Sequence, residues 1–399
     1  MQLFDTLRGA AAPLEIPQDR PLTLYVCGVT PYDTTHIGHA HTFLIFDVLQ
    51  RYLRYQGAEV RYCQNVTDVD DPLFERAKRD GVAWDELARR ETEQFRADCA
   101  AMNMLAPTYA PKASEEIAGM QAIIAKLVEL GYGYAAGGSA YYRARMAPDY
   151  GAMPKLDYEA LLAVANTRGN NPADPNKEDP LDFVLWQPSR PGEPSWPSPW
   201  GEGRPGWHIE CTAMSTRYLG DQIDIHGGGS DLVFPHHPSE IAQTEPVTGK
   251  SPFVRFWVHG GMARLDGEKM SKSLGNMVFV RDALKEHTAD ALRWYLMSFH
   301  YRADFDYVRE DVVATESKIT QLKSALRAES GAGAPLDAAS YRAAFLGAMD
   351  ADLNTPAALH TLDALSGAVL AAAREGRDLA KAQATLRELA GAFGFLAAE

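Results

Sequence analysis

The sequence predicts an α/β protein whose doubly wound parallel sheet is split by an inserted domain and followed by a C-terminal α-helical bundle. Three observations predict this fold: a β-α-β pattern over residues 22–66, a second alternation of helices and strands over 207–262, and a helical tail rich in Ala and Leu from about residue 305. A chain of 399 residues has room for two to four domains, each with its own core.

The first β-α-β unit is the clearest pattern. "LTLYVCGV", residues 22–29, is a short apolar run and predicts a buried strand. Apolar side chains then recur at helical spacing from Ile37 to Tyr55, and "GAEVRYCQNV" returns to a strand after Gly57. Consecutive parallel strands need such a crossover helix, so we assign residues 1–110 to the first half of a nucleotide-binding catalytic domain.

The rest of the chain divides by composition. Residues 111–205 form the predicted inserted connective domain, with one amphipathic helix and long Pro/Gly/Asn-rich tracts. Within it, "TRGNNPADPNK", residues 167–177, is expected to act as a lid that orders when ligand binds. Residues 206–304 are assigned to the second half of the catalytic domain, and residues 305–399 to the helical bundle.

 The chain is 46% hydrophobic and 23% charged, no apolar run reaches the roughly 20 residues of a bilayer span, and the start lacks the basic and apolar regions of a signal peptide. Four scattered cysteines fit a reducing compartment. The net charge of -14 opposes non-specific nucleic-acid binding but leaves room for a local basic patch. We therefore expect a cytoplasmic protein without membrane contact.

Two short motifs suggest phosphate chemistry. "HIGH", residues 36–39, opens the first predicted helix, where unpaired N–H groups attract phosphates and Gly38 permits close approach of a ligand. His36 and His39 could donate hydrogen bonds to phosphate oxygens during displacement at an α-phosphorus, although two capping histidines would have the same pattern. "GEKMSKSLGN", residues 267–276, carries Lys269 and Lys272 on a loop that could clamp pyrophosphate, the alternative being an ordinary exposed lysine pair.

Together the two motifs resemble the signatures of class I aminoacyl-tRNA synthetases. "YVCGVTPYDTTHIGHAHTF", "NVTDVDD", "DPLDFVLW" and "GRPGWHIECTAMSTRYLGDQIDIHGGGSDLVFPHH" are similar to the cysteinyl-tRNA synthetase family and to its relative, the mycothiol-pathway cysteine ligase, over about residues 1–390. The resemblance implies a class I Rossmann-like catalytic domain. It also implies activation of L-cysteine by ATP, accompanied by Mg²⁺, to cysteinyl-adenylate with release of pyrophosphate.

The resemblance further implies one zinc ion per chain that recognises the substrate thiol, held by Cys27, Cys211, His236 and Glu240. The residues themselves agree with this ligand set. His236 and Glu240 are four residues apart, so a helix presents both on one face, while Cys27 ends the first predicted strand. We expect zinc to favour the thiolate of cysteine over the hydroxyl of serine. His237 is expected on a different helix face from Glu240, in a supporting or packing role.

Other residues acquire roles only through the resemblance. The cysteinyl group or the adenylate is expected near Thr30, Thr42, Asn65 and Thr67. The adenosine is expected near Gly229, Ser230 and Asp231. Trp207 is expected to form a wall of the amino-acid pocket. A tight strand-to-helix turn would equally explain the glycine run before Ser230. Cys63 and Cys99 are expected to be buried apolar residues. The carboxylates of Asp68, Asp70 and Asp71 could form a magnesium cluster, but we expect them to cap helices or face solvent.

Two acceptors for the activated cysteine stay open at this stage. One is tRNA(Cys), which is esterified; the other is glucosaminyl-inositol, which forms an amide. The chain ends at "GAFGFLAAE", where an anticodon-binding domain would be expected to begin, and this short form favours the small acceptor. Glu240 as fourth zinc ligand and the start "MQLFDTL" favour the synthetase, so we expect a monomeric cysteine–tRNA ligase.

Two other classes of protein were compared with this hypothesis. A nucleotidyltransferase that shares the "HIGH" chemistry would not need thiol and imidazole ligands around an amino-acid pocket. A non-catalytic paralogue would tolerate loss of motif residues, yet "HIGH" and "KMSKS" are both complete. Both alternatives rank below cysteine activation.

Overall fold

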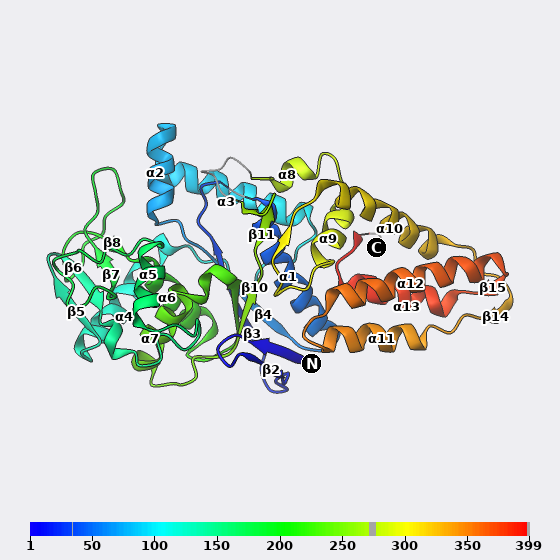
Figure 1. Cartoon of the computed structure of the whole chain (residues 1–399), viewed down its shortest axis with the longest axis horizontal. Coiled ribbons are helices and arrows are strands. Elements are labelled where there is room, and N and C mark those ends of the chain that lie inside the picture. Colours follow the sequence, from blue (N-terminus) through cyan, green and yellow to red (C-terminus); the bar gives the residue numbers. More distant parts are fainter. Residues whose placement is uncertain (34, 271–276, 397–399) are drawn as a thin grey trace.

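The computed structural model describes residues 1–33, 35–270 and 277–396. A parallel sheet lies at the centre of the elongated molecule, the inserted segment packs at one end, and the C-terminal helices form the other end (Figure 1). The mixed α/β architecture, with its parallel sheet and C-terminal helices, confirms the predicted fold class.

The central sheet has the order β10-β9-β3-β4, and every neighbouring pair in it is parallel. Its four strands are β3 (Leu22–Val29), β4 (Val60–Val66), β9 (Ile223–Gly229) and β10 (Val254–Gly260). Almost every residue of these strands is buried, because helices cover both faces and leave no polar face for solvent. Helix α1 (Ile37–Tyr55) connects β3 to β4, and α7 (His236–Thr248) connects β9 to β10. Helix α6 (Trp207–Leu219) precedes β9.

The two halves of the sheet meet between β3 and β9. Pairing of β3 with β9 ends at Val26 and Gly227, whereas β9 stays paired with β10 as far as Gly229. On its other side β3 shifts register relative to β4 between Val26 and Val29. The carboxyl ends of the strands therefore separate at the point where the strand order reverses, which is the usual position of a ligand crevice in such sheets.

The segment between β4 and α6 contains a second, antiparallel sheet of order β5-β6-β7-β8. Its elements, with the two helices that precede them, are α2 (Asp71–Asp80), α3 (Trp84–Ala101), α4 (Ile117–Glu129), β5 (Gly133–Ala136), β6 (Ser139–Tyr142), α5 (Tyr158–Asn166), β7 (Phe183–Gln187) and β8 (Arg204–Pro205). Strands β5 and β6 form a Tyr-rich antiparallel hairpin. Residues 167–177 have neither helix nor strand structure.

The C-terminal part packs long helices side by side (Figure 1). Its helices are α8 (Val280–Ala283), α9 (Ala289–Met297), α10 (Arg309–Arg327), α11 (Ala339–Asp350), α12 (Thr355–Arg374) and α13 (Ala380–Ala392). Short strands accompany them: β11 (Ala263–Leu265), β12 (Glu268–Lys269), β13 (Phe305–Asp306), β14 (Gly333–Pro335) and β15 (Arg377–Asp378). At the other terminus, β1 (Gln2–Asp5) and β2 (Ala10–Pro13) form a hairpin beside β10.

Among the described helices, only α12 is long and apolar enough to cross a membrane by length and composition. The sequence analysis finds no such run, because Thr, His, Asp and Ser interrupt the apolar residues of this helix. Leu362, Leu365 and Val369 of α12 are fully buried in the hydrophobic core that the bundle shares with α1. The apolar side of α12 is thus a packing surface of the bundle.

A buried ion pair joins the bundle to the catalytic sheet. Arg293 of α9 donates to the carboxylate of Asp47 on α1 at 2.6 Å and to the carbonyl of Met102 at 2.7 Å, and both charged side chains are almost completely buried. The guanidinium also donates to the carbonyl of Phe393, after α13. One side chain therefore ties together three distant parts of the chain, and its charge is compensated locally.

We predict that Arg293→Met destabilises the protein by about 3 kcal/mol, because Asp47 would lose the fully buried one of its two guanidinium partners and the carbonyls of Met102 and Phe393 would lose their donor. Urea unfolding followed by circular dichroism measures the change. Arg374→Met, at an exposed position on α12, is the matched control and should leave the unfolding midpoint unchanged. Equal midpoints for the two variants would contradict the role given to the pair.

Candidate functional site

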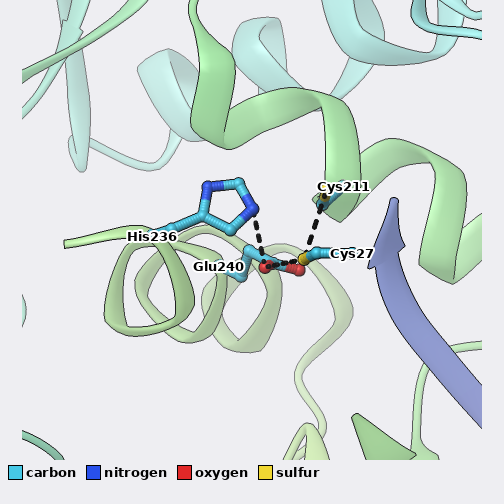
Figure 2. A group of neighbouring side chains, drawn as sticks. All are labelled: Cys27, Cys211, His236 and Glu240. Carbon is cyan, nitrogen blue, oxygen red and sulfur yellow. Dashed lines mark hydrogen bonds and ion pairs between the residues drawn. The ribbon is translucent and has the colours of Figure 1, made fainter. Parts of the chain in front are cut away.

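The four side chains predicted as metal ligands lie together at the carboxyl edge of the sheet. Cys27 comes from β3, Cys211 from α6, and His236 and Glu240 from the first turns of α7 (Figure 2). The Sγ atoms of Cys27 and Cys211 are 3.7 Å apart, and His236 Nε2 lies 3.2 Å from Glu240 Oε1. All four donor atoms lie within 4.8 Å of one another.

These distances fit a tetrahedral metal ion. With metal–sulfur bonds of about 2.3 Å, two thiolates on such an ion lie about 3.8 Å apart, and nitrogen and oxygen ligands lie about 3.3 Å apart. The two thiols are too far apart for a disulfide, whose sulfurs are about 2.05 Å apart, and both cysteines are free. Thiolate, imidazole and carboxylate are all ligand types that bind zinc.

Burial suppresses charge throughout this cluster. Desolvation raises the pKa of the Cys27 thiol and of the Glu240 carboxyl well above their usual values, and it lowers the pKa of the His236 imidazole well below its usual value. Neutral groups are therefore favoured when no cation is nearby. A divalent cation reverses this preference for thiols and carboxylates, because the charged forms become its ligands.

The helix face predicted for His237 is wrong, whereas its supporting role stays a prediction. His237 and Glu240 are three residues apart and share a helix face, so His237 Nε2 lies 3.9 Å from Glu240 Oε1 and 3.4 Å from Cys27 Sγ. His226 Nε2 contacts the other carboxylate oxygen of Glu240 at 2.9 Å. Cys27, His226, His237 and Glu240 thus form a second group that overlaps the first.

Sequence reasoning also missed two histidines that support the cluster. His226 is the central residue of β9, and His259 is the penultimate residue of β10. His259 Nε2 is 2.8 Å from His237 Nδ1, and its Nδ1 is 2.8 Å from the Thr6 hydroxyl. The strings "IDIH" and "FWVH" could have indicated them, because a histidine that follows apolar residues in a buried parallel strand needs a polar partner inside the protein.

Trp207 borders the metal cluster, as expected for a wall of the amino-acid pocket. Its indole stacks on the His236 ring with centroids 4.3 Å apart. The Nδ1 atoms of His208, the next residue, and His236 are 3.0 Å apart. The other ring nitrogen of His236, Nε2, faces the carboxylate of Glu240. The start of α6 therefore fixes the ring orientation of one candidate ligand.

The "HIGH" residues form the first turn of α1. His36 is the N-cap, and its Nδ1 accepts a hydrogen bond from the backbone N–H of His39 at 3.3 Å; the two rings stack with centroids 3.7 Å apart. A Cβ atom on Gly38 would lie 3.0 Å from the His36 ring, so a side chain there would crowd the imidazole. Thr42 donates to the carbonyl of Gly38 at 3.2 Å, one turn along the helix. The capping role is thus present, and it orients both imidazoles at a helix N-terminus.

The "KMSKS" segment is only partly described. Lys269 ends β12, while its side chain and the whole of Lys272 lie outside the described residues. The chain that follows is hydrogen-bonded to the first motif: Ile37 N–H donates to the carbonyl of Val278 at 2.9 Å, and Val280 N–H donates to the carbonyl of Thr35 at 2.8 Å. Backbone hydrogen bonds therefore hold the first motif against the chain that follows the second motif.

The residues expected near the amino acid lie at the ends of β3 and β4. Asn65 Oδ1 accepts the N–H of Gly28 at 2.8 Å, and Asn65 Nδ2 donates to the Thr67 hydroxyl at 3.1 Å. The Thr30 hydroxyl donates to Asp70, the N-cap of α2, at 3.3 Å. Burial raises the pKa of Asp70 to about 6. These bonds replace the sheet ladder where β3 and β4 shift register.

The residues expected near the adenosine follow β9. Gly229 ends that strand, and Ser230 and Asp231 begin a short 3₁₀ turn, η3 (Ser230–Val233). Arg168, from the irregular 167–177 loop, donates to the backbone carbonyl of Asp231. The loop therefore contacts the expected adenosine edge, and its ordering by ligand stays a prediction.

Comparison with known proteins identifies the family. Residues 14–317 match the model of the tRNA synthetases class I (C) catalytic domain, and residues 344–397 match the DALR domain. A cysteine–tRNA ligase of Dehalococcoides mccartyi is 43% identical over 99% of this chain and 86% of its own length. A cysteine–tRNA ligase of Pseudomonas aeruginosa is 42% identical over 100% of this chain and 86% of its own length. The chain belongs to the cysteine–tRNA ligase family of class I tRNA synthetases.

Solved structures of more distant class I synthetases share the fold of this family member. Methionyl-tRNA synthetase of Mycobacterium tuberculosis, in complex with methionyl-adenylate, is similar with a TM-score of 0.64 and 16% identity, over 94% of this chain and 89% of that chain. The LeuRS of Agrobacterium radiobacter, in a ternary complex with tRNA and LeuAMS, has a TM-score of 0.69 and 12% identity, over 95% and 85%. At these identities the similarity concerns the fold alone.

We predict that Gly28→Ala disrupts the site of this family member, because the new Cβ would lie 1.6 Å from the carbonyl oxygen of Asn65. The clash should cost about 3 kcal/mol or more and reduce metal content, measured by thermal unfolding and by elemental analysis. Gly119→Ala on α4 is the control, because nothing lies within 4 Å of its Cβ position. A Gly28→Ala protein as stable and as metal-rich as this control would contradict the close approach of β3 and β4.

Proposed function

We propose that this protein activates L-cysteine with ATP to cysteinyl-adenylate, releases pyrophosphate and transfers the cysteinyl group to tRNA(Cys). The observation that carries the proposal is the cluster of two thiols, an imidazole and a carboxylate at the sheet crevice, within a chain 42–43% identical to cysteine–tRNA ligases. An amino-acid-activating enzyme with soft ligands beside its substrate pocket is best suited to select a thiol.

We propose that Cys27, Cys211, His236 and Glu240 hold one zinc ion. When bound, zinc lowers the pKa of a thiol and prefers it to a hydroxyl, which would separate cysteine from serine. The protein itself contributes orientation: Trp207 and His208 fix the His236 ring, and His226 fixes the carboxylate of Glu240. His237 supports the cluster through its contact with Cys27.

For the adenylation step, we propose that His36 and His39 donate hydrogen bonds to the phosphates of ATP and that Lys269 and Lys272 neutralise the departing pyrophosphate, with Mg²⁺ accompanying ATP. Gly38 allows the phosphates to approach the backbone at the start of α1. The remaining contacts are assigned to the residues named for the amino acid and the adenylate: Thr30, Thr42, Asn65, Thr67, Gly229, Ser230 and Asp231. Attack by the cysteine carboxylate at the α-phosphorus forms the mixed anhydride and breaks the bond to pyrophosphate.

The acceptor proposed is tRNA(Cys), and the alternative, glucosaminyl-inositol, is not favoured by the relatives, which are named cysteine–tRNA ligases. The same relatives argue against a nucleotidyltransferase or a non-catalytic paralogue. A monomeric protein acting in the cytoplasm is the setting we propose for this reaction.

Cysteine should support exchange of radioactive pyrophosphate into ATP, and serine should not, because the proposed zinc discriminates the thiol.

Cys211→Ser should lose the metal and reduce kcat/KM for cysteine by more than about 100-fold, measured by exchange and elemental analysis. Cys63→Ser, a buried cysteine outside the metal cluster, is the control and should keep about one zinc per chain. Absence of exchange with every amino acid would refute adenylation, and a fully active, metal-free Cys211→Ser would refute the zinc site.

The acceptor is tested by offering tRNA and glucosaminyl-inositol in parallel to the enzyme with ATP and radioactive cysteine. We expect label in acid-precipitable RNA, released by mild alkali because an ester is formed. Heat-denatured tRNA from which the terminal adenosine has been removed is the control. An alkali-stable amide of the amino sugar, with no charged RNA, would show that the acceptor is the small molecule.

A further inference from the structure

A chain of polar contacts leads from the N-terminal hairpin to the metal cluster. The Thr6 hydroxyl lies 2.8 Å from Nδ1 of His259, and Nε2 of His259 lies 2.8 Å from Nδ1 of His237. The other ring nitrogen of His237, Nε2, lies 3.4 Å from Sγ of Cys27. Both imidazoles and the thiol are buried, whereas Thr6 is half-buried. These contacts connect a candidate metal ligand to a hydroxyl outside the cluster.

Backbone pairing fixes the position of Thr6. Its N–H donates to the carbonyl of Trp257 at 2.9 Å, and the carboxylate of the preceding residue, Asp5, accepts the N–H of Trp257 at 3.1 Å. Trp257 lies in β10, two residues before His259. The Thr6 hydroxyl is therefore held beside the His259 ring by the contact of the chain end of β1 with β10.

The metal end of this chain decides which nitrogens carry the hydrogens. Two ring nitrogens 2.8 Å apart share one hydrogen, and a neutral imidazole has one N–H and one lone pair. Burial of both rings disfavours a second hydrogen and its charge. A metal-bound thiolate only accepts, and the Glu240 carboxylate, 3.9 Å from Nε2 of His237, is an acceptor too. Nε2 of His237 therefore carries the hydrogen, and Nδ1 accepts from Nε2–H of His259.

This arrangement makes Thr6 the donor at the outer end. Nδ1 of His259 holds a lone pair, and the Thr6 hydroxyl donates to it. Without that hydroxyl the lone pair would be buried without its donor, which favours the other tautomer of both rings. In that tautomer a lone pair of His237 faces Cys27, and the thiolate loses the hydrogen bond that stabilises its charge.

The second, overlapping group of possible ligands requires the opposite direction. If His237 were itself a metal ligand, its Nε2 would hold a lone pair, its Nδ1–H would donate to His259, and Thr6 would accept. The first group contains both thiols, whose separation of 3.7 Å fits one metal ion, and it therefore carries the direction assigned above. The positions of two hydrogens distinguish the two groups.

We propose that Thr6 is a positioning residue of the metal site: its hydroxyl donates to His259, and the two histidines then direct an N–H of His237 at the thiolate of Cys27. Groups that hydrogen-bond to metal ligands typically change metal affinity by about 10–100-fold when they are lost. The role of Thr6 rests on the proposed zinc site and adds to it a residue of the N-terminal hairpin.

Two substitutions separate the hydroxyl from the shape of the side chain. Thr6→Val replaces the hydroxyl by a methyl group, and zinc affinity, measured by competition with a chelator, should fall about tenfold. Thr6→Ser keeps the hydroxyl and should restore the affinity. In the cobalt-substituted protein, the sulfur-to-metal charge-transfer band should shift in Thr6→Val and not in Thr6→Ser. Thr320→Val, at an exposed position on α10, is the matched control and should change neither measurement.

NMR of the zinc-bound protein with isotope-labelled histidine locates the hydrogens directly. His237 and His259 should both carry their hydrogen on Nε2 in the wild type. This measurement needs only the wild type, so it tests the direction even if Thr6→Val does not fold. Hydrogens on Nδ1 of both rings would overturn the direction and would make His237 a metal ligand.

Equal zinc affinity and equal cobalt spectra of Thr6→Val and the wild type, with zinc bound to both, would overturn the role of Thr6 alone. A wild type that binds no zinc would overturn the zinc site and, with it, the role of Thr6. The metal content of the wild type therefore separates the two failures.

Discussion

The separation of β3 from β9 beyond Val26 and Gly227 is the constraint on which the rest of the site depends. Backbone hydrogen bonds hold the two strands together up to that pair, and the strands then diverge where the two halves of the sheet meet. Polar and sulfur-bearing side chains can be buried there because they satisfy one another across the opening. Cys27 belongs to one half of the sheet, and Cys211, His236 and Glu240 belong to the other, so the cluster forms only when both halves are folded.

The helix that begins at this opening is also fixed at its centre. Asp47 lies in the middle of α1 and is bound by Arg293 of the bundle, while the first turn of α1 is hydrogen-bonded to residues 278–280 after the second motif. The position of His36 and His39 is therefore determined by three separate parts of the chain. Packing of the C-terminal helices can influence the first turn of α1 without contacting it, because close-packed interiors transmit strain.

The sequence predicts the parts of the fold that local patterns determine. One such pattern is the apolar run, which predicts the strands β3, β4, β9 and β10. Another is the i, i+4 spacing of His236 and Glu240, whose side chains the structure brings together. The order of the strands depends on tertiary contacts. The sequence alone therefore does not show that His226 of β9 and His259 of β10 lie in neighbouring strands beside the metal cluster. His237 was misplaced because i, i+3 neighbours also share a face. The two-residue strands β12 and β13 both pair with β11, and β13 lies about 40 residues further along the chain than β11. Two residues are too few to show the alternation of apolar and polar side chains that indicates a strand.

The cap at the start of α1 has a consequence for proton position. Nδ1 of His36 accepts the backbone N–H of His39, so this nitrogen holds a lone pair and the neutral ring carries its hydrogen on Nε2. This backbone hydrogen bond therefore favours one tautomer of the neutral ring. An imidazole in this state can give a hydrogen bond from its outer edge to an anionic oxygen while it remains uncharged, and its ability to do so does not depend on protonation of the ring.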